Sequence, residues 1–185
     1  MPEITPHYLA DNIISNLKII FDSSDFPFVK ISKFFHDIQS IEYNPNLEVD
    51  EQIGYFKRKK GPAVLETFWK SKEFLEFLSS VTGLDWHFSS AYHMCYSPGD
   101  YSLLHIDELE PKRLNVVYDF TKKWRIEWGG TDLYAFSDRD ALPYHRDYGS
   151  LRIAMLEKGD LSCTRYVSLK SQSDAVIDFA TYILD

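Results

Sequence analysis

One stretch of the sequence, from Tyr96 to Gly130, constrains the fold more than any other. A turn at residues 97–100 leads into a short apolar segment that ends in His105 and Asp107. In an extended strand, residues two apart point to the same side, so these side chains would present an imidazole nitrogen and a carboxylate oxygen to one point. A 2-His-1-carboxylate iron site contains such a pair and leaves coordination positions open for oxygen chemistry. The stretch therefore predicts a metal site at the end of a strand.

The residues after this pair follow a characteristic order. An alternating segment from Arg113 to Phe120 precedes Trp124, and Gly129-Gly130 opens a further strand-like run. The order Y-x-x-G-D, H-x-D, R, W and G-G resembles the 2-oxoglutarate- and Fe(II)-dependent dioxygenases of the prolyl-hydroxylase-like branch. The resemblance implies a double-stranded β-helix, Fe(II) and 2-oxoglutarate as cofactors, and hydroxylation of a peptide side chain or a small molecule.

The composition predicts one globular domain over residues 1–185. A hydrophobic content of 44% and an aromatic content of 16% are sufficient for a packed core and argue against disorder. A net charge of -8 makes a nucleic-acid-binding surface a poor expectation, because phosphate binding needs a basic face. The basic run Lys57–Lys60 is interpreted as a solvated loop or helix end.

The sequence shows no leader-like segment and no apolar run of about 18 residues that would cross a membrane. Cys95 and Cys163 are interpreted as reduced thiols, which predicts a cytoplasmic protein. We expect a small-molecule or peptide partner and neither nucleic acid nor membrane, and we leave the oligomeric state open.

Periodicity gives a coarse order of elements. The sequence predicts a helical N-terminal support region at 1–84 and a β-helix core at 85–185, an α+β fold that is mainly β and jelly-roll-like, with helices packed outside. Within the first region, the segment 37–62 is interpreted as a long loop that would line the mouth of the site. The individual expectations are helices at 6–22 and from Ser71 to Gly83, and strands at 27–31, 86–96, 113–120, 131–136, 151–157, 165–170 and 175–184.

The resemblance also implies a second His about 50 to 60 residues after the first, and an Arg or Lys several residues later that would pair with 2-oxoglutarate. The corresponding segment, 160–170, contains no His, and 171–178 contains no Arg. Three explanations stay open. Cys163 would replace the second His, or His145 or His93 would complete the site from another direction, or the site is degenerate and has two ligands.

Other residues are candidates to support the cosubstrate. Tyr96 matches a family position whose phenol bonds 2-oxoglutarate, and Tyr118 is a second pocket candidate. Arg165 or Lys170 would take the far carboxylate, depending on which face of a strand looks inward. Arg113 matches a family Arg, and Asp178 lies in an apolar run where a carboxylate must be paired or face the pocket. We expect both of these residues to support the site by contacting the side chains that bind the metal or the cosubstrate.

Three functions follow from these residues. The first is an oxygenase that uses Fe(II), 2-oxoglutarate and O2, and the second is a dioxygenase-fold protein that binds a ligand without turnover. The third is an iron oxygenase that takes its electrons from its substrate alone and does not use 2-oxoglutarate.

Overall fold

The fold, in a computed structural model, is described for residues 2–23, 26–37, 46–105, 112–136 and 139–184. Its helices are a 3-10 turn η1 (Pro6–Leu9), α1 (Asp11–Ser23), α2 (Glu66–Trp69), α3 (Lys72–Thr82) and a 3-10 turn η2 (Ile126–Trp128). Its strands are β1 (Phe28–Ile31), β2 (Glu48–Gln52), β3 (Phe56–Pro62), β4 (Trp86–Tyr96), β5 (Tyr101–His105), β6 (Lys112–Asp119), β7 (Asp132–Phe136), β8 (Arg139–Tyr144), β9 (Leu151–Glu157), β10 (Leu161–Thr164) and β11 (Ala175–Leu184).

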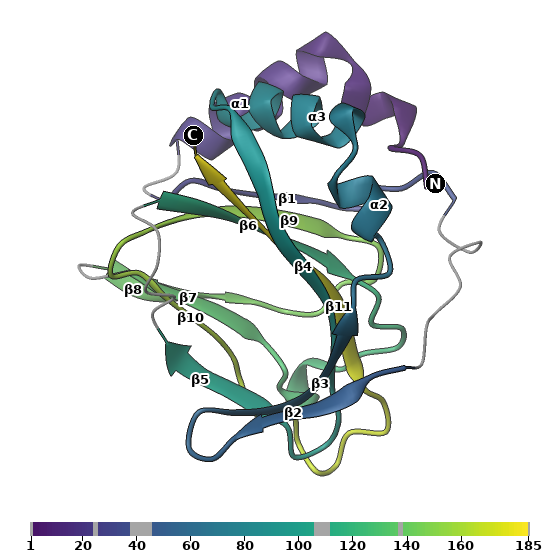
Figure 1. Cartoon of the computed structure of the whole chain (residues 1–185), viewed down its shortest axis with the longest axis vertical. Helices are drawn as coiled ribbons and strands as arrows, with labels where there is room; N and C mark the ends of the chain where they lie inside the picture. The colour runs from purple at the N-terminus through teal and green to yellow at the C-terminus, as the bar shows by residue number, and fades with distance from the viewer. Residues whose placement is uncertain (1, 24–25, 38–45, 106–111, 137–138, 185) are drawn as a thin grey trace.

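The strands form one curled antiparallel sheet in the order β1-β9-β6-β11-β4-β3-β5-β10-β7-β8, with β2 paired to β3. We call β1, β9, β6, β11, β4 and β3 the major sheet and β5, β10, β7 and β8 the minor sheet. The two ends of this path come together, because Phe28 on β1 stacks on Tyr144 of β8 with ring centroids 4.0 Å apart. The curled sheet confirms the expected double-stranded β-helix, and Figure 1 shows α1 and α3 stacked outside it.

The main hydrophobic core lies between the helices and the major sheet. Helix α3 is specified locally: the Ser71 side chain accepts a hydrogen bond from the Phe74 N–H at 3.2 Å, and Gly83 ends the helix in the left-handed conformation. Its Phe74 and Leu78 are fully buried in this core. The predicted helix and its two capping residues are confirmed.

The predicted loop at 37–62 is wrong where the structure describes it. Strands β2 and β3 form an antiparallel hairpin, and β3 pairs with both β4 and β5. More than half of the residues in the two strands are charged, so the sequence lacks the apolar alternation that marks a half-buried strand. The strand expected at 165–170 is also wrong, because the strand in this region, β10, ends at Thr164. Strand β8 was not predicted.

A β-bulge in β4 changes which side chains face inward. The pairing partner of Thr181 is Ser90, whereas that of Tyr182 is Phe88, so Ser89 is an extra residue in the ladder. Trp86 and Phe88 therefore pack against the helix layer, while later aromatic residues of the same parity face the inside of the barrel. The bulge therefore divides the alternating large side chains of β4 between the two faces of the sheet.

Two further expectations concern the chain as a whole. Cys95 and Cys163 are free thiols in the structure, as the sequence predicted. No helix among the described residues is long and apolar enough to cross a membrane. The division at residue 84 stays a prediction, although β1, β2 and β3 come from the N-terminal region and join the sheet.

Candidate functional site

A cavity of about 330 Å³ lies between the major and minor sheets, inside the barrel. Cavities of this size, at the lower end of the usual range for ligand sites, accept a small molecule. Its polar lining comes from strands of both sheets and includes Arg58, Lys60, Tyr96, His105, Arg113 and Cys163. Whether a predicted site residue lines this cavity is therefore the test of its expected position.

His105 ends β5 and lines the cavity, as expected for a ligand at the end of a strand. Its Nδ1 lies 2.8 Å from the carbonyl oxygen of Leu103. Asp107, its expected partner, lies outside the described residues. The residue opposite His105 on the neighbouring strand β10 is Ser162, which also lines the cavity.

The three candidates for a further metal ligand have different positions. Cys163 lines the cavity, but burial and then the nearby charge of Asp132 raise the pKa of its thiol, which disfavours the thiolate form that binds metals. His145 is exposed, does not line the cavity, and its Nδ1 lies 3.2 Å from Oγ1 of Thr131. Within the described residues, no group of three or more His, Cys, Asp and Glu side chains is placed to hold a metal ion.

His93 and Asp178 lie on the other face of the major sheet, toward the helices. Both are fully buried, and Nδ1 of His93 is 2.6 Å from Oδ1 of Asp178. The carboxylate also accepts hydrogen bonds from the backbone N–H groups of Val64 and Leu65 and from Nε1 of Trp69, at 3.2, 2.7 and 3.3 Å. Asp178 therefore fastens the start of α2 to the sheet. This position corrects the expectation that it supports the cavity, and it removes His93 from the cavity wall.

Of the two tyrosines expected to contact the cosubstrate, one lines the cavity and the other does not. Tyr96 lines the cavity with 2% of its surface exposed, in agreement with its expected place. Tyr118 faces the helix layer, with its ring centroid 4.9 Å from those of Phe35 and Phe120. Burial raises the pKa of Tyr118 well above its ordinary value. Its alternation with cavity-facing neighbours on β6 places it on the wrong face for a cosubstrate contact.

Arg165 and Lys170, the two expected partners of the far carboxylate, are exposed and do not line the cavity. They lie in the connection after β10, because that strand ends at Thr164 instead of continuing to residue 170. Arg113, by contrast, is buried at 4% exposure and lines the cavity from β6, opposite Ile183 of β11.

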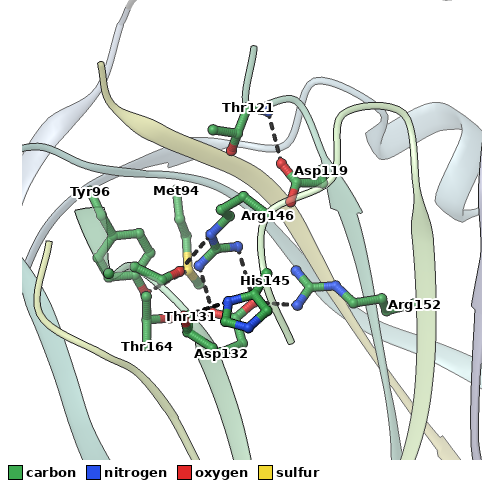
Figure 2. A network of polar contacts seen from close by, with 12 residues as sticks. Met94, Tyr96, Asp119, Thr121, Thr131, Asp132, His145, Arg146, Arg152 and Thr164 are labelled. Atoms are coloured by element: carbon green, nitrogen blue, oxygen red, sulfur yellow. Dashed lines mark hydrogen bonds and ion pairs between the residues drawn. The ribbon is translucent and has the colours of Figure 1, made fainter. Parts of the chain in front are cut away.

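A buried ionic cluster, which sequence reasoning missed, lies at the cavity wall on β7 (Figure 2). Arg146 donates two hydrogen bonds to the carboxylate of Asp132, at 2.6 and 3.0 Å, and Nη1 of Arg152 lies 2.7 Å from it. Thr164 donates a hydrogen bond to the same carboxylate at 2.8 Å. Burial acts to raise the pKa of Asp132, but the two guanidinium charges and the hydrogen bonds overcome it and lower this pKa.

Two cavity residues on β3, Arg58 and Lys60, were also missed. They belong to the basic run that was interpreted as a solvated loop. Their spacing could have indicated that the two side chains share a face, because residues two apart in a strand point to the same side. It could not be used without knowing that the segment is a strand.

The donor chemistry of the cavity fits 2-oxoglutarate better than it fits iron. Cationic side chains from β3 and β6 suit a dicarboxylate. For iron, the described residues supply one His, while the facing position holds Ser162, whose neutral hydroxyl is a poor ligand. They do not complete a site with three protein ligands.

No protein-family model matches this sequence, and no curated protein matches it. Solved structures do. A Pseudomonas putida prolyl-4-hydroxylase has a TM-score of 0.66 and 9% identity, covering 91% of this chain and 99% of that one. A Trichoplax adhaerens prolyl hydroxylase, in complex with a hypoxia inducible factor peptide, has a TM-score of 0.66 and 12% identity, covering 96% and 93%.

A viral collagen prolyl hydroxylase from Paramecium Bursaria Chlorella virus-1, in its 2-oxoglutarate complex, has a TM-score of 0.59 and 14% identity and covers 89% of this chain and 99% of that one. Identities this low show the fold and no more. The chain has the double-stranded β-helix fold of the 2-oxoglutarate- and Fe(II)-dependent oxygenases, in the form found in prolyl hydroxylases.

Proposed function

We propose that this protein is an oxygenase that uses Fe(II), 2-oxoglutarate and O2 to hydroxylate a peptide side chain or a small molecule. The observation that carries the proposal is the position of His105, which reaches the barrel cavity from the end of β5 in a fold shared with such oxygenases. The cavity, about 330 Å³, suits a small cosubstrate together with one side chain of a substrate better than a large ligand enclosed whole.

In this proposal, His105 and Asp107 would hold the metal. Bound iron would supply the oxidation of the substrate by O2, coupled to decarboxylation of 2-oxoglutarate. The protein's own part is to keep the cavity dry and to orient the cosubstrate. Tyr96, buried at the cavity wall, would donate a hydrogen bond to the cosubstrate, and Arg113, which also lines the cavity, would attract one of its carboxylates.

Anaerobic titration with Fe(II), with and without 2-oxoglutarate, tests the proposal. Chelation of iron by 2-oxoglutarate gives a weak metal-to-ligand charge-transfer band, which we expect in the wild type and not in His105→Ala. His145→Ala is the matched control, because that His is exposed and away from the cavity. An equally strong band in His105→Ala would contradict the proposal. So would a failure to form succinate from 2-oxoglutarate with any substrate tested. Iron-dependent oxygen uptake without 2-oxoglutarate would instead favour the oxygenase that does not use this cosubstrate.

A second candidate function is ligand binding without turnover. It is favoured by the pairing of His105 with Ser162. Directly opposed residues in an antiparallel pair lie about 5 Å apart, so the side chain facing His105 is a neutral hydroxyl and not a strong metal ligand. In this case the wild type binds no iron, and Ser162→His, which adds an imidazole opposite His105, gains iron binding. Ser168→His, outside the cavity lining, is the control. Stoichiometric iron in the wild type, with succinate formation stimulated by a substrate, would rule out this candidate.

A further inference from the structure

The hairpin strand β3 contributes a cationic wall to the cavity. The side chains of this strand alternate, so that Arg58 and Lys60 line the cavity while Lys57 and Lys59 are exposed. The protein as a whole has a net charge of -8, so a pair of cations on one side of its internal cavity runs against the overall charge.

Arg58 is held in place by neighbours on three sides. Its Nε donates a hydrogen bond to the carboxylate of Asp50 at 2.8 Å, its guanidinium lies 4.5 Å from the ring centroid of Phe56, and Nη1 is 3.8 Å from Sδ of Met94. Burial acts to lower the pKa of Arg58, but Tyr96 and Asp50 raise it, so the side chain stays charged. Arg58 is thus a fixed cation beside Tyr96.

Lys60 has a different environment. Its ammonium lies 3.5 Å from the ring centroid of Tyr92, a cation–π contact. Among the described residues, no carboxylate lies within 4.0 Å of this ammonium. Burial, and then the charge of Arg58, lower the pKa of Lys60 despite a weaker opposing effect of Asp50. Its positive charge is therefore the less compensated of the two.

Within the part of the chain that the structure describes, the charges of this wall do not sum to zero. Asp50 is one carboxylate for two cations, and the carboxylate of Asp132, which also lines the cavity, is already bound by Arg146 and Arg152. An anion in the cavity would complete the balance, and a partly buried ammonium binds a carboxylate more strongly than an exposed one because less water screens it.

We propose that Arg58 and Lys60 form the subsite that binds a carboxylate group of the ligand in the barrel cavity, with Lys60 as the direct ion-pair partner. The subsite takes the place of the Arg that the sequence lacks after residue 170, and it lies on β3 instead of the C-terminal strand. The identification of the ligand as 2-oxoglutarate rests on the proposed function. The position of its carboxylate rests only on the contacts of Arg58 and Lys60.

Calorimetric titration of 2-oxoglutarate without metal, and in parallel of succinate, tests the subsite. Lys60→Met keeps the length of the side chain and removes its charge, and we expect its affinity to fall by about tenfold or more. Lys59→Met is the matched control, since it removes the same charge from the adjacent residue on the outer face of the same strand. Thermal unfolding of each variant verifies that the fold is retained.

The outcomes separate this inference from the oxygenase proposal. A tenfold loss in Lys60→Met with wild-type affinity in Lys59→Met supports the subsite, whether or not turnover is ever seen. Equal affinities in all three proteins, equal losses in both variants, or no binding of either dicarboxylate to the wild type overturns it. Turnover with 2-oxoglutarate that Lys60→Met leaves unchanged overturns the subsite and leaves the oxygenase proposal standing.

Discussion

Two buried polar side chains on opposite faces of the major sheet, Asp178 and Asn115, differ in how their polar atoms are satisfied. On the helix face, the carboxylate of Asp178 is fully buried and bonded to His93, two backbone N–H groups and an indole. On the cavity face, Asn115 of β6 is 1% exposed, and neither atom of its amide has a hydrogen-bond partner in the described structure. Arg58 and Lys60 face the same cavity, and among the described residues Asp50 is the carboxylate that pairs with them, through Arg58.

The helix-facing group contributes to stability, whereas the cavity-facing groups are available to bind a ligand. Buried polar groups are normally satisfied, because leaving one without a partner costs free energy. The Asp178 carboxylate on the helix face follows that rule. The cavity face departs from it, as sites that recognise a ligand do when part of their hydrogen bonding is completed by that ligand.

The largest expected effect comes from removing the satisfied carboxylate. Asp178→Ala leaves its buried donors without an acceptor, and we expect the free energy of unfolding to fall by about 4 kcal/mol. Denaturant unfolding measures the change. The exposed carboxylate of Asp22, in a pair with Lys18, provides the control Asp22→Asn, for which we expect less than about 1 kcal/mol. Similar losses in the two variants would end the contrast between the faces.

Asp132→Asn is expected to cost slightly less, about 3 kcal/mol, because it removes the charge that neutralises Arg146 and Arg152 and retains an oxygen acceptor. The folded-state pKa of Asp132 lies below its ordinary value of 3.8, so its stabilising contribution is present above that pH and is lost as the pH falls through the lower, folded value. Unfolding measured below about pH 4 should therefore be less pH-dependent in the variant. An unchanged acid dependence would contradict this account of the cluster.

Asn115→Leu should change stability in the opposite direction. A side chain of similar size replaces an amide without partners, and we expect the free energy of unfolding to rise by about 1 kcal/mol. The same measurement on Asn12→Leu, in α1 and exposed, should show no comparable gain. A loss of stability at position 115 would mean that the cavity face satisfies its polar groups as the helix face does.

The smallest expected effect concerns the end of a helix outside the sheet. Ser71→Ala removes the acceptor of the Phe74 N–H, and we expect a loss of about 1 kcal/mol. Ser80→Ala, an exposed position within the same helix, controls for the loss of a hydroxyl. A loss as large as that of Asp178→Ala would show that the helix layer depends on its local cap and less on its anchor to the sheet.

Local patterns predicted the parts of the fold whose signals lie close together in sequence. The caps at Ser71 and Gly83 specify α3, and β9 and β11 have the boundaries that their apolar runs indicated. The hairpin of β2 and β3 was missed because its charged residues do not alternate with apolar ones. It becomes a strand pair by joining β4 and β5, which are distant partners that periodicity does not reveal.

The candidate site was predicted in part. His105, Tyr96, Arg113 and Cys163 line one cavity, which the sequence motifs had placed near one another. His93 and Asp178 were assigned to the wrong side, because alternation tells which residues share a face but not which face looks inward. Asp107 lies outside the described residues, and its role as a ligand stays a prediction.

A resemblance of motifs implied the oxygenase fold, and residue patterns alone indicated a mainly β content, the cap and length of α3, and a His at the end of a strand. These features depend on short-range propensity, capping and turn residues. Only the tertiary structure decided that Ser162 faces His105, that Ser89 forms a bulge which reverses the faces of β4, and that Arg58 and Lys60 point into the barrel. The physical reason is that register and curvature are set by pairing between distant strands, and a shift of one residue exchanges the two faces of a sheet.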